Sequence, residues 1–228
     1  TFFLKRLIAR GGMGAIYEAE QLGAEGFIKT VALKTVQPEI ADSESFVLSF
    51  IGEAKLVAQR LDWEALDGLV WSPWGTVLFA EETGNAVFTD PDHPAAIRGL
   101  LYEMKLDKHD PAKAEWIKVR PMLGSVSHEG IEFDSAGNVY VIDENGPGAI
   151  YKFVPKQYGD LSDGQLYALK LDDGSNTDRT GPAEWVALDM GLAQMDARTA
   201  AANAGATGYG RPEDLERIGG NLYVAITS

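Results

Sequence analysis

The segment that decides the fold is HEGIEFDSAGNVYVIDE, residues 128–144. Apolar and polar residues alternate in its first part, the turn-forming residues Ser135–Asn138 follow, and β-branched and aromatic residues run from Val139 to Ile142. Period-two alternation on both sides of a glycine-containing turn is typical of a β-hairpin. The segment therefore predicts a hairpin with acidic residues at its two outer ends.

This pattern occurs twice more in the chain. DGLVWSPWGTVLFAEE, residues 67–82, aligns without a gap, because Gly75 and Gly137 are 62 positions apart, as are Glu82 and Glu144. EDLERIGGNLYVAI, residues 213–226, aligns with one residue deleted. Three copies of one hairpin indicate a repeat architecture.

A second repeat extends the unit. GLLYEMKLD at 99–107 matches GQLYALKLD at 164–172, and each is followed by a Glu-Trp strand, at Glu115-Trp116 and Glu184-Trp185. A hairpin, a Leu-Tyr strand and a Glu-Trp strand make a four-stranded unit repeated at about 60 to 80 residues, which is typical of β-propeller blades. We predict a mainly β fold: an incomplete propeller with two blades and part of a third. The segment 149–154 also alternates, and the alanine-rich segment 194–207 is predicted to form a short helix.

Composition and charge narrow the function classes. The 228 residues are 45% apolar, enough for a core, and no apolar run approaches the roughly 20 residues of a membrane helix. The chain has no cysteine, so it has neither disulfides nor cysteine-ligated metals. The net charge of −14 lies entirely beyond residue 61, which predicts domains at 1–61 and 62–228. The acidic balance disfavours nucleic acid as a partner and favours cations.

Because the chain lacks an initiator methionine and stops within a predicted strand, we expect a fragment at both ends.

The N-terminal domain carries a glycine-rich turn. Residues 7–19, LIARGGMGAIYEA, predict a strand, a turn and a strand. Such a turn is either an ordinary hairpin or a loop whose amides approach phosphate closely. Lys34 ends a further strand, and apolar residues at helical spacing in 46–58 place Glu53 where it meets Lys34.

These features, over about residues 4–60, resemble the N-terminal lobe of a bacterial serine/threonine protein kinase, a small α+β unit. The resemblance implies ATP binding with magnesium, with Lys34 on the α and β phosphates and Glu53 orienting Lys34. The chain has no His-Arg-Asp catalytic loop and no Asp-Phe-Gly magnesium loop. We therefore predict no kinase activity. The glycines that would cover the phosphates are Gly11, Gly12 and Gly14.

A candidate metal site follows from the repeat. In a propeller, the loops that enter the inner strands converge on the central axis, so equivalent positions of successive blades meet there. Carboxylates gathered on one axis repel unless a cation lies among them, and oxygen ligands suit calcium, with iron or manganese as alternatives. The competing interpretation is that these acids are solvated or pair with Arg211. The candidate ligands are Glu81, Glu82, Glu129 and Glu213.

Over about residues 65–228 the chain resembles the PhoX-type alkaline phosphatase family. The resemblance rests on PWGT at 73–76 with the paired glutamates, on HEG at 128–130 and on RPED at 211–214. It implies a secreted propeller that holds iron and calcium and hydrolyses phosphate monoesters. By resemblance, Glu129 and Glu213 ligate iron, Glu81 helps to hold calcium, and Arg211 grips the substrate phosphate as a catalytic residue.

One departure from this family pattern concerns the metal. The iron-ligating cysteine before the paired glutamates is Ala80 here, so the resemblance predicts impaired iron chemistry and leaves oxygen-only calcium sites. His128 is either a further ligand or a solvated residue, and because a histidine at a loop edge is more often solvated, we interpret it as solvated.

Two other classes of function remain open. One is an ATP-binding kinase-like or pseudokinase module with an attached β sensor domain, and the other is a non-catalytic scaffold or fusion fragment. The cellular compartment also stays open, because the kinase-like part suggests the cytoplasm and the PhoX-like part suggests the periplasm or secretion.

Overall fold

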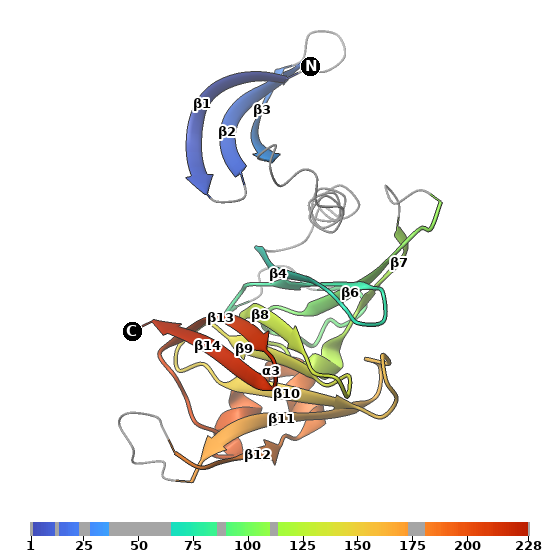
Figure 1. The fold of residues 1–228 in the computed structure, drawn as a ribbon, viewed down its shortest axis with the longest axis vertical. Coiled ribbons are helices and arrows are strands. Elements are labelled where there is room, and N and C mark those ends of the chain that lie inside the picture. The colour runs from blue at the N-terminus through green and yellow to red at the C-terminus, as the bar shows by residue number, and fades with distance from the viewer. Residues whose placement is uncertain are drawn as a thin grey trace. The chain divides into compact units, whose positions relative to one another are not determined.

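The computed structural model divides the chain into two compact units, Thr1–Ile51 and Gly52–Ser228. The first holds a small sheet, and the second holds the repeats (Figure 1). The residues that the structure describes are 2–11, 14–22, 28–36, 65–85, 90–109, 114–172 and 181–227.

The N-terminal unit contains a three-stranded antiparallel sheet in the order β1-β2-β3. β1 (Phe2–Gly11) and β2 (Gly14–Leu22) pair up to Gly11 opposite Gly14, so the two strands predicted on either side of the glycine-rich segment are confirmed. The third strand is β3 (Ile28–Val36), in which Lys34 lies opposite Ile16. Gly12, the predicted helix at 46–58 and its Glu53 lie outside the described residues.

The second unit begins with a four-stranded antiparallel sheet in the order β4-β5-β6-β7. All five residues of β5 are buried, so this strand forms the middle of the local core. The predicted succession of hairpin, Leu-Tyr strand and Glu-Trp strand is confirmed in this sheet. A 3-10 turn, η2 (Pro121–Leu123), leads on to the next sheet. The four strands are β4 (Leu66–Trp71), β5 (Val77–Glu81), β6 (Leu101–Leu106) and β7 (Ala114–Val119).

The second sheet has five strands, so the prediction of four is wrong here. β10 is hydrogen-bonded between β9 and β11, whereas the equivalent strands β5 and β6 of the first sheet pair directly. Tyr151 and Phe153 of β10 are completely buried, so this strand carries a core face of its own and takes a central position. The strands are β8 (His128–Phe133), β9 (Val139–Asp143), β10 (Ile150–Pro155), β11 (Gly164–Leu171) and β12 (Ala183–Ala187).

The repeated hairpin is present three times, as predicted. β4–β5 and β8–β9 are the first two copies, and β13 (Arg211–Ile218) with β14 (Asn221–Thr227) is the third. The equivalent turn glycines Gly75 and Gly137 have φ values of 83° and 84°, and Gly219 has 63°. This left-handed conformation strongly favours glycine, so it explains the turn glycine at the same place in the first two copies. In the third copy the left-handed residue is Gly219, one position before Gly220, which aligns with Gly137.

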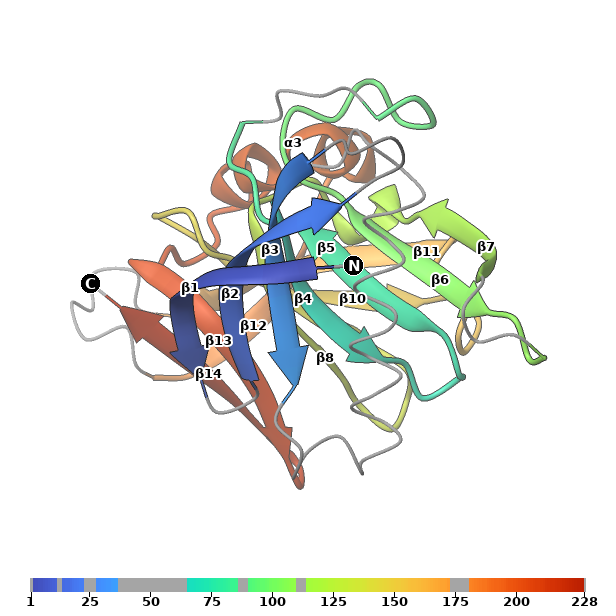
Figure 2. The same cartoon turned by 90° about the horizontal axis from the view of Figure 1, so that it is seen from above.

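α3 (Met190–Asn203) overlaps the predicted helix at 194–207 but begins earlier. Asp189 caps its N-terminus by accepting a hydrogen bond from the Leu192 amide at 3.1 Å. Figure 2 shows the helix at the periphery of the unit, beside the sheets. No helix among the described residues is long and apolar enough to span a bilayer. The buried face of α3 includes Ala193, Ala197, Ala200 and Ala201.

A buried glutamate organises the packing between the two large sheets. Glu103 of β6 accepts hydrogen bonds from the Trp74 indole (2.9 Å), the Thr76 hydroxyl (2.6 Å) and the Arg120 guanidinium (2.7 Å). The Trp74 ring then packs edge-on against Phe133 of the second sheet, with centroids 5.2 Å apart. Trp74 is therefore a packing residue between the sheets.

The first strands of the three hairpins approach one another closely at glycines. A Cβ on Gly68 of β4 would lie 2.1 Å from the Glu129 carbonyl oxygen of β8. A Cβ on Gly130 of β8 would lie 2.5 Å from the Leu215 Cβ of β13. Because real Cβ atoms do not come this close, only glycine permits this spacing, and β4, β8 and β13 therefore lie next to one another.

We expect Gly130→Ala to destabilise the protein by about 1–3 kcal/mol, because the added methyl group overpacks the contact with Leu215. Gly220→Ala is the matched control, since nothing lies within 4 Å of its Cβ position, and it should change stability by less than about 0.5 kcal/mol. Urea unfolding measures both. Equal stability of the two variants would contradict the close approach of β8 and β13.

Candidate metal centre

Three carboxylates meet where the first two hairpins touch. Asp67 of β4, Glu82 after β5 and Glu129 of β8 each place an oxygen within 4.8 Å of the others. Glu82 is held there because its backbone forms an antiparallel bridge to Ser127, just before β8. Gly68 adopts φ +56°, which lets β4 come against the Glu129 backbone. Backbone pairing and a glycine contact thus bring together three groups of like charge.

Glu129 is the member of this cluster whose pKa is raised by its surroundings. Its Oε2 is buried and has no hydrogen-bond partner. Burial, and then the negative charges of Asp67, Glu82, Glu213 and Asp214, raise the pKa of Glu129 from 4.5 to about 7. Near neutral pH this carboxyl therefore holds its proton much more readily than an ordinary glutamate. An oxygen without a donor, among four acidic neighbours, is suited to accept a cation.

The third hairpin places one arginine and two acidic residues beside the cluster. Arg211 pairs through Nη2 with Glu144, and its Nε lies 3.4 Å from Glu213 Oε1. The Arg211 side chain is 57% exposed, so its guanidinium can still reach a ligand. Glu213 and Asp214 lie near enough to the cluster for the negative charge of each to raise the pKa of Glu129. Of the predicted residues, Glu82, Glu129, Glu213 and Arg211 thus gather in one region.

Glu81 lies apart from the group of three. It is buried, and its Oε2 accepts a hydrogen bond from the Leu100 amide at 3.2 Å. Residues adjacent on a strand point to opposite sides, so a site that uses Glu82 turns Glu81 away. The preceding residue, Ala80, belongs to the hydrophobic core and is completely buried.

The interpretation of His128 as a solvated residue is wrong. Its side chain is completely buried, because β8 begins inside the unit with His128 paired to Asp143 of β9. Nε2 lies 3.0 Å from the Gly124 carbonyl, so it donates a hydrogen bond in the tautomer that fits. Burial lowers the pKa of His128 to about 4, which makes it a neutral core residue near pH 7.

The comparisons with known proteins bear on this region directly. The family described as alkaline phosphatase PhoX matches residues 70–228, which contain the second and third hairpins and the first hairpin from Val70 onward. The chain belongs to the PhoX family of alkaline phosphatases.

Two further comparisons place limits on the rest of the chain. A stretch of 58 residues near the N-terminus is 40% identical to tyrosine-protein kinase MasK of Myxococcus xanthus (strain DK1622). It covers 25% of this chain and 9% of that protein, so the chain spans under a tenth of this curated relative. No solved structure matches the chain.

Two acidic residues of this region, Asp67 and Glu144, were not among the candidates predicted from the sequence, although the spacing of the repeat indicates both. Asp67 stands 62 positions before Glu129, the same spacing that relates the hairpin turns, so it is the first copy's equivalent of Glu129. Glu144 is likewise the second copy's equivalent of Glu82. The 62-residue spacing applied to both ends of the hairpin therefore predicts Asp67 and Glu144.

The predicted nucleotide site is only partly described. Gly11 and Gly14 lie opposite each other at the end of the β1–β2 hairpin where the two strands are connected, and Lys34 lies on β3. Gly12, Glu53 and the side chain of Lys34 lie outside what the structure describes.

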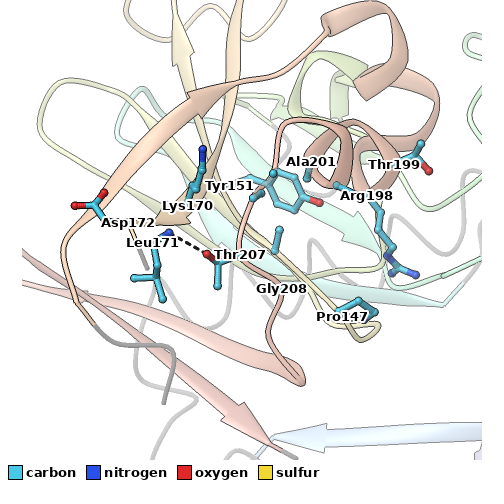
Figure 3. A pocket seen from close by; sticks show the side chains of 14 residues that line it. Pro147, Tyr151, Lys170, Leu171, Asp172, Arg198, Thr199, Ala201, Thr207 and Gly208 are labelled. Atoms are coloured by element: carbon cyan, nitrogen blue, oxygen red, sulfur yellow. Dashed lines mark hydrogen bonds between the residues drawn. The ribbon is translucent and has the colours of Figure 1, made fainter. Parts of the chain in front are cut away.

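A cavity of about 630 Å³ opens elsewhere in the PhoX-like unit, between α3 and strands β10 and β11 (Figure 3). The Tyr151 hydroxyl is buried there without a hydrogen-bond partner and points towards the helix that carries Arg198. Lys170 and Asp172 lie at its other end. Its lining, within the described ranges, includes none of the predicted metal or phosphate residues, so the cavity is separate from the carboxylate cluster.

The raised pKa of Glu129 predicts a pH-dependent stability. Because its folded pKa (about 7) exceeds the ordinary 4.5, the folded state binds the proton more tightly between these values. The free energy of unfolding of the cation-free protein should therefore fall as pH rises from about 4.5 to about 7. Glu129→Gln should flatten this fall and add on the order of 1 kcal/mol at pH 8.

Urea unfolding with chelator at pH 5 and pH 8 measures this difference. Glu216→Gln, which alters an exposed carboxylate on β13, is the control and should behave like the parent protein. The same pH slope in Glu129→Gln and the parent would show that Glu129 titrates normally.

Proposed function

We propose that residues 62–228 form a phosphatase domain of the PhoX type that holds a divalent cation at Asp67, Glu82 and Glu129. The single observation that carries this proposal is the buried Glu129 Oε2, which has no donor and lies among acidic neighbours. Elsewhere in proteins, a carboxylate in such a position is paired, protonated or bound to a metal. The substrate class that the family supports is a phosphate monoester.

Calcium fits these residues better than iron does. The cluster offers carboxylate oxygens, which suit a hard cation, and Asp67 is exposed enough to leave a path for entry. A thiolate ligand before the paired glutamates does not fit, because position 80 is an alanine enclosed in apolar core. When bound, a divalent cation supplies charge that stabilises the oxygens of a transferring phosphoryl group.

The protein's own residues would then orient the phosphate. Arg211 presents a planar guanidinium that forms paired hydrogen bonds with phosphate oxygens. Glu144 holds one edge of that guanidinium, and the exposed remainder stays available to a ligand. Glu213 lies beside it and keeps the local charge negative, which favours a cation and phosphate together over phosphate alone.

We further propose that the three hairpins are inner parts of propeller blades. The support is the side-by-side placement of β4, β8 and β13, whose equivalent residues Asp67, Glu129 and Glu213 all contribute charge to one region. Convergence of equivalent positions is what blades arranged around an axis produce.

We expect calcium to raise the thermal midpoint of the protein by several degrees, since a ligand that binds only the folded state stabilises it. Glu129→Gln and Glu82→Gln should each weaken calcium binding by about tenfold or more, because each removes one charged ligand. Glu216→Gln should bind as the parent does. Calorimetric titration gives the affinities. A parent protein that binds no calcium, or a Glu129→Gln variant with unchanged affinity, would refute the cation site.

A second function is proposed for residues 1–61, namely ATP binding by a kinase-like module. It is supported by the identity with MasK and by the β1–β2–β3 sheet, whose hairpin ends at the glycine-rich turn. ATP should raise the thermal midpoint of the chain, and Lys34→Ala should abolish this effect, while Lys5→Ala, which alters an exposed lysine on β1, should not. A chain that responds to neither calcium nor ATP would be a non-catalytic scaffold.

A further inference from the structure

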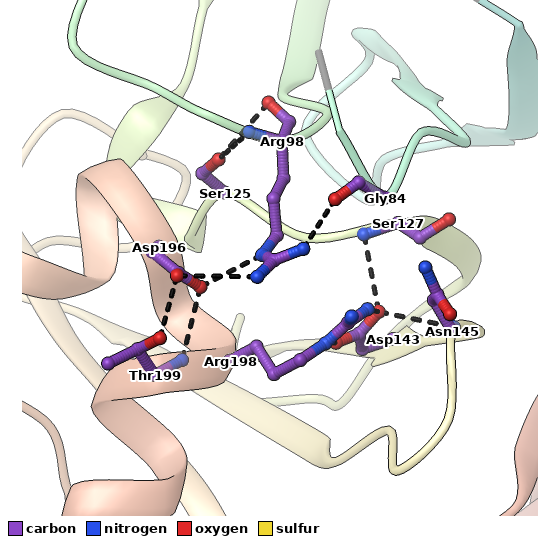
Figure 4. Close-up of polar contacts among 9 residues, drawn as sticks. All are labelled: Gly84, Arg98, Ser125, Ser127, Asp143, Asn145, Asp196, Arg198 and Thr199. Carbon is purple, nitrogen blue, oxygen red and sulfur yellow. Dashed lines mark hydrogen bonds and ion pairs between the residues drawn. The ribbon is translucent and has the colours of Figure 1, made fainter.

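α3 is interrupted at Asp196, whose φ and ψ of −156° and 87° are not helical. The Asp196 carboxylate accepts hydrogen bonds from the Thr199 amide (3.1 Å) and the Thr199 hydroxyl (2.7 Å), as Figure 4 shows. A side-chain acceptor bound to the amide three residues on is the geometry of a helix N-cap. The kink is therefore a specified feature, because the second half of the helix has a start signal of its own.

One arginine ties this kink to the loop that follows Glu82. Arg98 donates from Nε to Asp196 Oδ1 at 2.9 Å, and its Nη1 donates to the Gly84 carbonyl. Its backbone is fixed by Ser125, whose hydroxyl accepts from the Arg98 amide (3.0 Å) and donates to the Arg98 carbonyl (3.1 Å). The Arg98 guanidinium thus joins the loop 82–85 to the helix, and the neighbouring backbone supports this link, since the Gly99 amide donates to the Thr83 carbonyl and the Ile97 amide to the Met195 carbonyl, each at 3.0 Å.

A second arginine ties the kink to the loop that follows β9. Arg198 donates from Nε to Asp143 Oδ2 (2.7 Å) and from Nη2 to Asp143 Oδ1 (2.6 Å), a bidentate pair. The Asp143 side chain is completely buried, and its Oδ1 also accepts from the amides of Ser127 and Asn145, each at 3.3 Å. The next residue, Glu144, donates its amide to the Ser127 carbonyl and directs its carboxylate to Arg211.

The two loops are also packed against each other. A Cβ on Gly84 would lie 2.1 Å from the Asn145 side-chain nitrogen, so the backbone of one loop is in direct contact with a side chain of the other. One loop carries Glu82 of the carboxylate cluster, and the other carries Glu144, the partner of Arg211. Both loops are therefore fixed to one kinked helix and to each other.

We propose that Arg98 and Arg198 are positioning residues that hold the cation ligands and the phosphate-binding Arg211 in register. This inference rests on the proposed cation and phosphate site, but it concerns residues that touch neither ligand. A buried ion pair adds little net stability compared with apolar packing, whereas it does fix one geometry. The geometry fixed here is that of the two loops that carry the site.

The test compares lysine variants of three buried arginines. Arg198→Lys and Arg98→Lys keep the charge and lose the bidentate fork. Arg120→Lys is the matched control, since Arg120 and Glu103 form a pair of similar burial, with side chains 12% and 2% exposed against 19% and 0% for Arg198 and Asp143. Thr199→Val, which removes only the capping hydroxyl, serves as a milder variant should a lysine variant fail to fold.

Two readouts follow from the proposal. Amide hydrogen exchange should accelerate at least about tenfold in residues 143–146 for Arg198→Lys and in 83–85 for Arg98→Lys, and less strongly at both for Thr199→Val. This corresponds to a loss of about 1.4 kcal/mol of local stability. Calcium affinity should fall by about tenfold in both lysine variants. Arg120→Lys should leave exchange in both loops and calcium affinity as in the parent, whatever its thermal midpoint.

The proposal is overturned if the loops exchange as in the parent, or if Arg120→Lys reduces calcium affinity as much as Arg198→Lys does. A parent protein that binds no calcium would defeat the proposed cation site. Hydrogen exchange would still decide whether the arginines hold the loops, so the two failures are distinguishable.

Discussion

The close approach of β4, β8 and β13 is the constraint on which the candidate site depends. It requires glycine at position 68 against the Glu129 carbonyl and at position 130 against Leu215. Because the backbones lie this near, the equivalent side chains Asp67, Glu129 and Glu213 lie in one region, and all three are acidic. Packing therefore creates the electrostatic problem that a cation would relieve, because neutral packing forces assemble the site and charge repulsion opposes it.

The repeat made much of this arrangement predictable from sequence. The hairpins, their glycine turns and the gathering of Glu82, Glu129 and Glu213 all follow from period-two alternation and from a spacing of 62 residues. These signals are local, so they can be read without knowledge of tertiary contacts. Asp67 has the same 62-residue spacing to Glu129, so its place in the cluster was predictable from the repeat as well.

Other features were not predictable, because they depend on contacts distant in sequence. β10 lies between β9 and β11. Alternation of apolar and polar residues predicts that a segment is a strand, but it does not specify which strands are its neighbours in the sheet. The burial of His128 depends on the Gly124 carbonyl and on the strand that covers it. The pairs of Arg98 with Asp196 and of Arg198 with Asp143 join residues 98 and 55 positions apart, and neither spacing carries a periodic signal.

A comparison of the hydrogen-bond donors around the carboxylates of this unit supports a functional role for Glu129. Glu103 has three donors, Asp143 has a bidentate arginine and two amides, and Asp196 has an arginine and a cap. Among the buried side-chain atoms of the described residues, the carboxylate oxygen left without a partner is Glu129 Oε2.

A chain that satisfies its other buried acids so fully has the means to satisfy this one. An unpaired, desolvated polar oxygen costs about 1–3 kcal/mol of stability, and a charged oxygen costs more. Such a cost is commonly retained where a ligand offsets it, and surrounding negative charge favours a cation, which supports the proposed cation site.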